Sequence, residues 1–244
     1  MDLPWINNYS IQMIFGNLLK GIYPIFKPKG ITSFRVISIL RKITGVKKIG
    51  HGGTLDPLAS GVLVVAIGKE FTRKIHLQVA KEKEYEAEIM LGLTSTTDDE
   101  EGIKNVVETS RDLSQQEIEK ILPQFIGRID QVPPIYSAIK IKGQEAYKLA
   151  RQGKKVEMKS RIVEIKSIEI TSYKWPLLSI KVVCGSGLYI RSLARDLGKK
   201  LGTGGYLHNL VRTRVGEYKL EDCLQLPTSL PENTKVTKLQ TKLD

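Results

Sequence analysis

A glycine-rich loop followed at once by an apolar run places the tightest local constraint on this chain. Residues 50–61 read Gly-His-Gly-Gly-Thr-Leu-Asp-Pro-Leu-Ala-Ser-Gly, and residues 62–67 read Val-Leu-Val-Val-Ala-Ile. The second run is rich in β-branched residues and is bounded by glycine, which predicts a short buried strand. The glycines permit a tight turn against that strand, so the Asp56 carboxylate can be held in a fixed geometry that a ligand can approach.

On local chemistry alone, Asp56 has two equally good interpretations. It can cap a turn or a helix, or it can be a rigidly held functional carboxylate. The segment is not a phosphate-binding P-loop, because the terminal Gly-Lys-Ser/Thr of that motif is missing.

The charge balance points to a polyanionic partner. The 38 Lys and Arg residues exceed the 26 Asp and Glu residues, giving a net charge of +12. Such an excess favours nucleic acid ahead of an anionic membrane surface. The plain alternative is a basic enzyme whose charge only aids solubility. No apolar run approaches the roughly 18 to 20 residues that span a bilayer, and two Cys with three His predict neither a disulfide scaffold nor a zinc site.

Periodicity predicts elements along the first half of the chain. Thr32 or Ser33 can cap a helix that Gly45 closes. Its apolar stripe comprises Val36, Ile39, Leu40 and Ile43. From residue 84 onward, apolar and acidic side chains alternate, which predicts a half-buried strand. The acidic residues 98–101 predict a solvated loop.

The second half mixes helices and strands. Ser114 and Glu117 form a capping box for a helix that Pro123 ends or kinks, and strands are expected near 162–170 and 178–184. A further helix has an apolar stripe of Ile190, Leu193, Ala194 and Leu197, with Arg191, Arg195 and Lys199 on the opposite side. Because the elements do not alternate strictly, an α/β chain of the α+β type fits better than a doubly wound parallel sheet.

Three segments are expected along the chain. Residues 1–21 would be an N-terminal extension with a short amphipathic helix and no signal peptide. Residues 22–225 would form the main domain, and residues 226–244 a partly ordered tail.

Several motifs together resemble the bacterial tRNA pseudouridine-55 synthases, the TruB family. Beside the loop at 50–61, the matching blocks are Lys27-Pro28-Lys29-Gly30-Ile31-Thr32-Ser33, Lys83-Glu84-Tyr85, Val132-Pro133-Pro134-Ile135-Tyr136-Ser137-Ala138, Tyr147-Lys148-Leu149-Ala150-Arg151, and residues 186–198. Each block is weak by itself. All the blocks occur in the family's order over residues 22–225, and the probability that all of them match by chance is negligible.

This resemblance implies a pseudouridine synthase fold, with a central, largely antiparallel mixed sheet flanked by helices. It implies an enzyme, an isomerase that converts uridine 55 in the tRNA T loop to pseudouridine. The base is flipped out, the C1′–N1 bond breaks, and C5 bonds to C1′. The resemblance implies tRNA (T stem-loop) as partner, no cofactor, no metal and no membrane, and we expect a cytoplasmic monomer.

The resemblance also assigns roles to residues. Asp56 matches the catalytic aspartate, which either forms a covalent adduct or supports a glycal route. Arg191 matches the arginine that pairs with this carboxylate, although a helix arginine in that position is ordinarily exposed. Tyr189 matches an active-site tyrosine that would assist removal of the C5 proton; otherwise it is a core tyrosine.

Four further positions match substrate-binding residues of the family. Tyr85 would stack on the flipped uracil, although its strand pattern alone predicts core packing. His51 would take part in rearranging the T loop, although a lone histidine in such a loop is more often structural. Leu210 would line the uracil pocket. Arg73, or alternatively Lys74, would replace the lysine of a short family motif that is one residue longer here.

Other departures from the family concern Phe26, which stands where an aspartate is usual, and Val211, which stands where a second basic residue is common. The chain is expected to lack the C-terminal PUA module of many relatives, so the basic stretch 140–155 would carry much of the phosphate contact. Two alternatives remain open: a non-catalytic RNA-binding or tRNA-folding protein, and a synthase that acts on another structured RNA.

Overall fold

A nine-stranded mixed sheet is the centre of the fold. The computed structural model describes residues 20–227 except 110, 142 and 155. Seven strands follow one another in the order β1-β3-β12-β4-β11-β10-β7; β2 also pairs with β3, and β13 pairs with β12. Within the described residues, β3 and β12 are the one parallel pair in this sheet. The strands of the sheet are β1 (Gly21–Lys27), β2 (Ile49–Gly52), β3 (Ala59–Ile67), β4 (Lys83–Leu91), β7 (Gly127–Gln131), β10 (Arg161–Lys174), β11 (Leu177–Cys184), β12 (Gly205–Val215) and β13 (Tyr218–Lys219).

Helices and two small hairpins surround this sheet. The hairpins are β5 (Leu93–Ser95) with β6 (Lys104–Val106), and β8 (Lys140–Ile141) with β9 (Gln144–Glu145). The helices are α2 (Ser33–Thr44), α3 (Lys69–Lys74), α4 (His76–Val79), α5 (Gln115–Ile121), α6 (Ala146–Arg151) and α7 (Ile190–Leu201), with short 3-10 turns η1 (Leu122–Phe125) and η2 (Leu220–Asp222). The expected α+β architecture with a largely antiparallel mixed sheet is confirmed.

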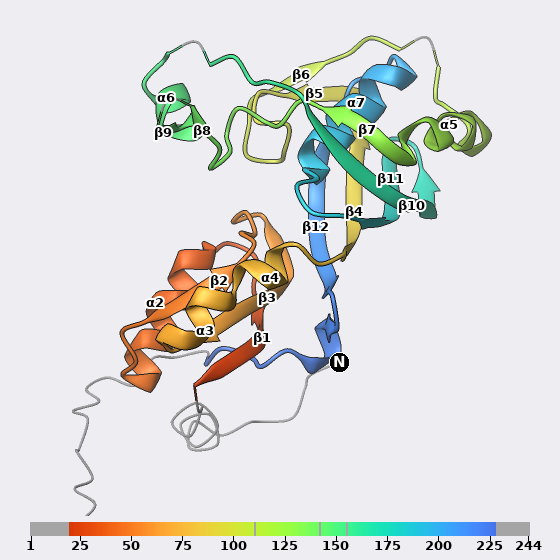
Figure 1. Ribbon diagram of the computed structural model, residues 1–244. Helices are drawn as coiled ribbons and strands as arrows, with labels where there is room; N and C mark the ends of the chain where they lie inside the picture. Colours follow the sequence, from red (N-terminus) through yellow and green to blue (C-terminus); the bar gives the residue numbers. More distant parts are fainter. Residues whose placement is uncertain (1–19, 110, 142, 155, 228–244) are drawn as a thin grey trace, which may run out of the picture.

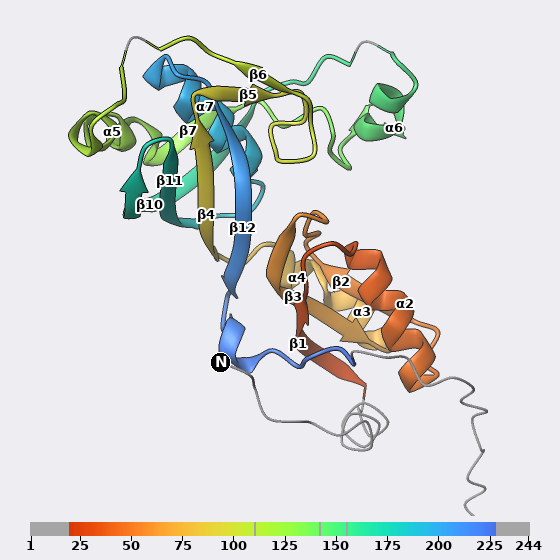
Figure 2. The same ribbon diagram turned by 180° about the vertical axis from the view of Figure 1, so that it is seen from behind.

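The molecule has a lower and an upper half, joined by the long strand β12 (Figure 1). The lower half contains β1, β2 and β3 with α2, α3 and α4. The upper half contains β4, β7, β10 and β11 with α5 and α7, and the view from behind shows the same division (Figure 2). Because β12 pairs with β3 on one side and β4 on the other, the glycine-rich loop before β3 lies where the halves meet.

The predicted helix caps are confirmed. The Thr32 side chain accepts a hydrogen bond from Arg35 N at 3.1 Å, and Gly45 ends α2 at a φ of 69°. The interior face of α2 includes Ile37 (2% exposed) in place of the expected Ile39, which is half-buried. The Ser114–Glu117 capping box is present, and the helix ends two residues before Pro123.

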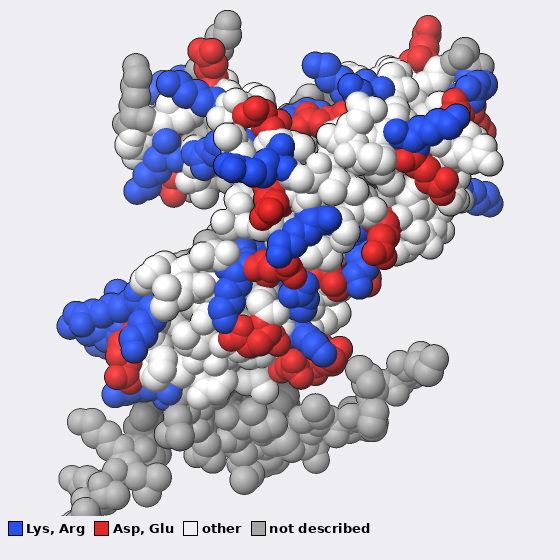
Figure 3. Space-filling view, turned by 45° about the vertical axis from the view of Figure 1, so that its right-hand side comes forward, with Lys and Arg blue, Asp and Glu red and all other residues white. Residues whose placement is uncertain are grey.

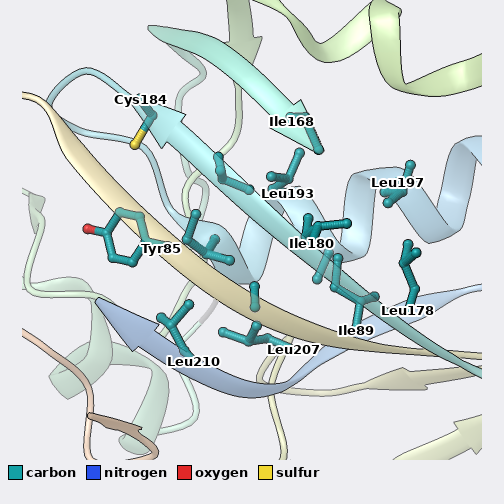
Figure 4. Packing of buried hydrophobic residues seen from close by; sticks show 14 of the residues in the cluster. Tyr85, Ile89, Ile168, Leu178, Ile180, Cys184, Leu193, Leu197, Leu207 and Leu210 are labelled. Atoms are coloured by element: carbon teal, nitrogen blue, oxygen red, sulfur yellow. The ribbon is translucent and has the colours of Figure 1, made fainter. Parts of the chain in front are cut away.

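The main core lies between the upper sheet and α7. The stripe predicted for that helix is buried, and it packs on Ile89 of β4, Ile180 of β11 and Leu207 of β12 (Figure 4). The alternation predicted for β4 is also confirmed, since its odd-numbered residues are buried and the three glutamates are not. A second core lies between α2 and the lower strands.

The helix expected at Ile11–Leu18 and the tail beyond 227 lie outside the described residues. None of the helices in the described part of the chain has the length and apolarity that a bilayer crossing requires.

Candidate active site

The start of α2 holds the loop that carries Asp56. The Ser33 hydroxyl donates to Leu55 O at 3.0 Å and accepts from Leu55 N at 2.9 Å, while Gly30 N donates to Pro57 O at 2.7 Å. The residues on both sides of Asp56 are therefore tied to the turn and helix that precede the loop in sequence. Asp56 caps no helix, because the segment after it continues as strand β3. It does begin a turn, since its backbone O accepts from Ala59 N at 3.1 Å.

Arg212 of β12 also fixes the loop. Its side chain is 1% exposed, and its guanidinium donates to Val62 O at 2.8 Å and to Gly53 O at 3.1 Å. Gly61 lies so close to this strand that a Cβ would sit 2.2 Å from Arg212 O, and its φ is 109°. Only glycine fits both the contact and the backbone conformation.

Asp56 forms an ion pair with Arg191, as the resemblance implies. Arg191 Nη2 lies 2.9 Å from Asp56 Oδ2, and the arginine side chain is 5% exposed while that of Asp56 is 40% exposed. Arg191 is thus a buried residue of α7, and the ordinary case of an exposed helix arginine is wrong here. The pair leaves the outer side of the carboxylate open to a ligand.

The second partner of Arg191 is an acid that sequence reasoning missed. Arg191 Nη1 lies 3.3 Å from Asp99 Oδ2, and Nη2 also donates to Tyr136 O at 2.9 Å. The expectation of a solvated loop at 98–101 is therefore wrong for Asp99, which is 4% exposed, and for Asp98, which pairs with Arg195 at 2.8 Å. The loop folds onto α7 because two adjacent acids meet two arginines one helical turn apart.

The environment raises the pKa of the Asp56 carboxyl above its ordinary value. Burial is the main cause and the charge of Asp99 adds to it, whereas Arg191 and Lys27 lower the pKa. A carboxylate with a raised pKa is a stronger base and nucleophile than a free aspartate, provided that the pH keeps it ionised.

Lys27, at the end of β1, is a second residue that sequence reasoning did not select for the site. It is fully buried, and its Nζ donates to Pro28 O at 2.9 Å and to Ile31 O at 2.8 Å. Burial lowers the pKa of Lys27 to about 8. The only available signal was its place in the Lys-Pro turn, which does not reveal burial.

Tyr189 and Tyr85 come from two elements close enough to the ion pair for its charges to affect the pKa of both phenols. Tyr189 precedes α7, and the Gln131 side chain bonds both its backbone N, at 2.9 Å, and its O, at 3.2 Å. Tyr85 is 7% exposed at the edge of the main core, and Figure 4 shows its hydroxyl pointing away from that cluster. Burial raises the pKa of both phenols, while Arg212 lowers that of Tyr85 and Arg161 and Arg191 lower that of Tyr189.

Leu210 borders the loop, and His51 lies within it. Leu210 pairs with Ala59 on one side and Ala87 on the other, and it is 7% exposed. His51 pairs with Val65, and its buried Nδ1 has no hydrogen-bond partner among the described residues. Burial lowers the pKa of His51, and Arg212 adds to this effect.

Arg73 stands apart from these residues. It is an exposed residue of α3 and lines a surface pocket with Lys20, Lys69 and Glu70. None of its described contacts reaches Asp56 or Arg191. Phe26, the other departure from the family pattern, packs on the apolar cluster around Val62 and Val64.

Positive charge surrounds the open side of the molecule. Figure 3 shows the surface hollowed between the two halves, with Lys and Arg side chains on both sides of the hollow. Among the described residues, no group of three His, Cys, Asp or Glu side chains is arranged to hold a metal ion.

Known proteins share both the sequence and the fold. The family model for the N-terminal domain of TruB family pseudouridylate synthases matches residues 41–190, and the model for the C-terminal domain of tRNA pseudouridylate synthase B matches residues 191–232. Two curated relatives are named tRNA pseudouridine synthase B. The protein of Acaryochloris marina is 46% identical over 211 residues, covering 85% of this chain and 72% of its own. That of Clostridium tetani is 41% identical over 215 residues, covering 88% and 74%.

Solved structures of related proteins agree. A chain from a Cbf5-Nop10-Gar1 complex is 30% identical with a TM-score of 0.66, and one from an H/ACA RNP bound to a substrate RNA containing 2′-deoxyuridine is 28% identical with a TM-score of 0.63. Each match covers 88% of this chain, which spans about half the length of those chains (54% and 52%). On the two family models and the curated relatives, the chain belongs to the TruB family of pseudouridylate synthases.

Proposed function

We propose that this protein is a tRNA pseudouridine synthase that converts uridine 55 of the T loop to pseudouridine. The observation that carries the proposal is the Asp56–Arg191 pair, in which a buried guanidinium holds a carboxylate whose outer side is open. Membership of the family and the names of the curated relatives support a tRNA substrate.

The reaction is an isomerisation, so uridine and pseudouridine contain the same atoms and no oxidant or reductant is consumed. The C1′–N1 bond of the uridine breaks, the uracil turns while bound, C5 bonds to C1′, and the C5 proton leaves while N1 gains one. Asp56 either bonds covalently to the ribose or base and is released again as the product forms, or takes the C2′ proton on a glycal route and returns it. A carboxylate suits attack at the ribose because it meets the positive charge that develops at an anomeric carbon, and on the glycal route it acts as the base.

The neighbouring residues would hold and release the base. Tyr85 would stack on the flipped uracil and Leu210 would line its pocket, because both border the loop of Asp56. Tyr189 would assist at C5; since burial raises the pKa of its phenol, it would relay this proton rather than act as a free phenolate. His51 would contact the opened T loop, and Arg73 would contact RNA phosphate away from the reacting base.

The test is pseudouridine mapping on an unmodified tRNA transcript, in buffer with EDTA. We expect conversion at the T-loop uridine by the wild-type protein and none by Asp56→Asn. Asp130→Asn is the matched control, because Asp130 is an exposed aspartate of β7, and it should retain activity. Tight binding without conversion would favour a tRNA-folding protein, and conversion only in another RNA would favour a synthase with a different substrate.

A further inference from the structure

An exposed aromatic side chain stands at the start of α2. Phe34 is 63% exposed, although it lies beside the apolar stripe of a well-packed helix. It contributes nothing to the core below α2, because its ring faces water. A single exposed apolar side chain is ordinary by itself; Phe34 differs in the arginine that contacts its ring and in the link of its backbone to the loop of Asp56.

The ring is held on one side by an arginine. The Arg41 guanidinium carbon lies 5.7 Å from the centroid of the Phe34 ring, and Arg41 Nη2 donates to Ile49 O at 3.1 Å. The hydrogen bond fixes the guanidinium to β2, and the cation–π contact places the ring over it. The other face of the ring is left to solvent, which makes a flat surface available for stacking.

This surface is attached to the catalytic loop. Ser33, the residue before Phe34, exchanges two hydrogen bonds with the backbone of Leu55, which directly precedes Asp56. These two hydrogen bonds tie the backbone that carries Phe34 to the loop that carries Asp56.

The charge around the ring favours a polyanion. No Asp or Glu occurs between Asp2 and Asp56, whereas the same stretch carries many Lys and Arg residues. Three of these, in the turn before α2 and on α2 itself, are exposed: Lys29, Arg35 and Lys42. A protein partner with an apolar patch would meet this charge unfavourably, whereas the backbone of RNA would be attracted to it.

We propose that Phe34, supported by Arg41, is a stacking platform for an unpaired RNA base next to the uridine that reacts at Asp56. This inference rests on the proposed function and adds a recognition residue to it. An enzyme that extrudes one base leaves its neighbours unstacked, and an aromatic face can hold such a base in place whatever its identity.

The test compares RNA affinity and steady-state kinetics of Phe34 variants on an unmodified T stem-loop. Phe34→Ala should weaken binding and raise KM by roughly five- to one-hundred-fold, the range expected for the loss of one base–aromatic stack, with little change in kcat. Phe34→Tyr should behave like wild type. Phe34→Leu should be as weak as Phe34→Ala, because leucine keeps the apolar area but lacks a face for stacking.

The matched control is Leu77→Ala. Leu77 is 56% exposed on α4, and its removal should leave affinity and KM unchanged. In a stem-loop with 2-aminopurine beside the target uridine, wild-type protein should quench the fluorescence and Phe34→Leu should not. Unchanged affinity of Phe34→Ala, or full rescue by leucine, would overturn the platform; failure of the wild type to form pseudouridine would instead overturn the proposed function.

Discussion

The buried cations of this chain illustrate how single residues shape the site. Among the described residues, the buried lysines and arginines include Lys27, Arg191 and Arg212. Burying a charge is costly unless partners satisfy it. Lys27 donates to backbone carbonyls of the turn before α2, Arg212 to a carbonyl of the glycine-rich loop, and Arg191 pairs with the Asp56 carboxylate itself. Burial of these cations therefore lowers the stability of the folded protein, and in return it holds the Asp56 carboxylate in place.

Lys27 allows this cost to be measured through pH. Its native pKa is about 8, against 10.5 for a free lysine, so the unfolded chain binds more protons between these values and stability rises with pH. We expect the free energy of unfolding of wild type, relative to Lys27→Met, to increase by roughly 2 kcal/mol between pH 7.5 and pH 10. Urea denaturation at both pH values measures this. The exposed Lys29 of the same turn supplies the control, Lys29→Met, which should show no such change.

At the scale of elements, the packing of α7 on β12 decides where Arg191 lies. Gly198 of α7 meets the start of β12 so closely that a Cβ would sit 2.2 Å from the carbonyl carbon of Gly204 and 2.3 Å from Gly205 N. Arg195 binds the same helix to Asp98 at 2.8 Å and to Val132 O at 2.8 Å. The helix is therefore held by a close backbone contact on one side and by charged contacts on the other.

Replacing Gly198 by alanine should push α7 away from the sheet. Since the atoms in the way belong to the backbone, we expect a loss of roughly 1 to 3 kcal/mol in the free energy of unfolding, as for other overpacked interiors, together with reduced kcat as Arg191 moves. Denaturant unfolding and single-turnover kinetics are the measurements. In Gly185→Ala the new Cβ meets its nearest neighbour at an ordinary 3.6 Å; equal losses in the two variants would contradict the explanation.

At the scale of the whole molecule, the segment with β8, β9 and α6 extends from the upper half (Figure 1). Lys148 and Arg151 both lie 5.7 Å from the ring centroid of Tyr147, and Lys148 also pairs with Glu145 at 2.6 Å. Lys142 and Lys155 of the predicted basic stretch lie outside the described residues. Lys140, Lys148, Arg151 and Lys154 of this stretch are exposed, so phosphate can reach them.

Neutralising Lys148, Arg151 and Lys154 together should weaken the binding of tRNA whatever its nucleotide sequence, and should make the affinity less dependent on salt. The slope of log K against log salt is negative, and each lost phosphate contact makes it less negative by about 1. The triple variant should therefore reduce the magnitude of the slope by up to about 3. Filter binding over a range of KCl concentrations gives the slope. A triple variant of exposed lysines elsewhere, Lys120, Lys174 and Lys200, should leave it nearly unchanged; identical slopes for wild type and the first variant would refute the role.

Local chemistry determined much of this protein. The caps of α2, the alternation of β4 and the apolar stripe of α7 could be read from sequence, because each depends on neighbouring residues and a fixed period. The same holds for the loop of Asp56, whose glycines and following strand predicted a rigid turn. The pairing of Asp56 with Arg191 came from family resemblance, since 135 positions separate the two and no local period links them.

Only the tertiary structure decided which charges are buried. The acids at 98–101 carry the ordinary sequence signature of a solvated turn, yet Asp99 is interior because it pairs there with Arg191, which also donates to the backbone carbonyl of Tyr136 in a third segment. Lys27 likewise follows a strand pattern that says nothing of its burial. Burial of a charge depends on long-range partners that satisfy it, and such partners are specified by the fold rather than by any stretch of sequence.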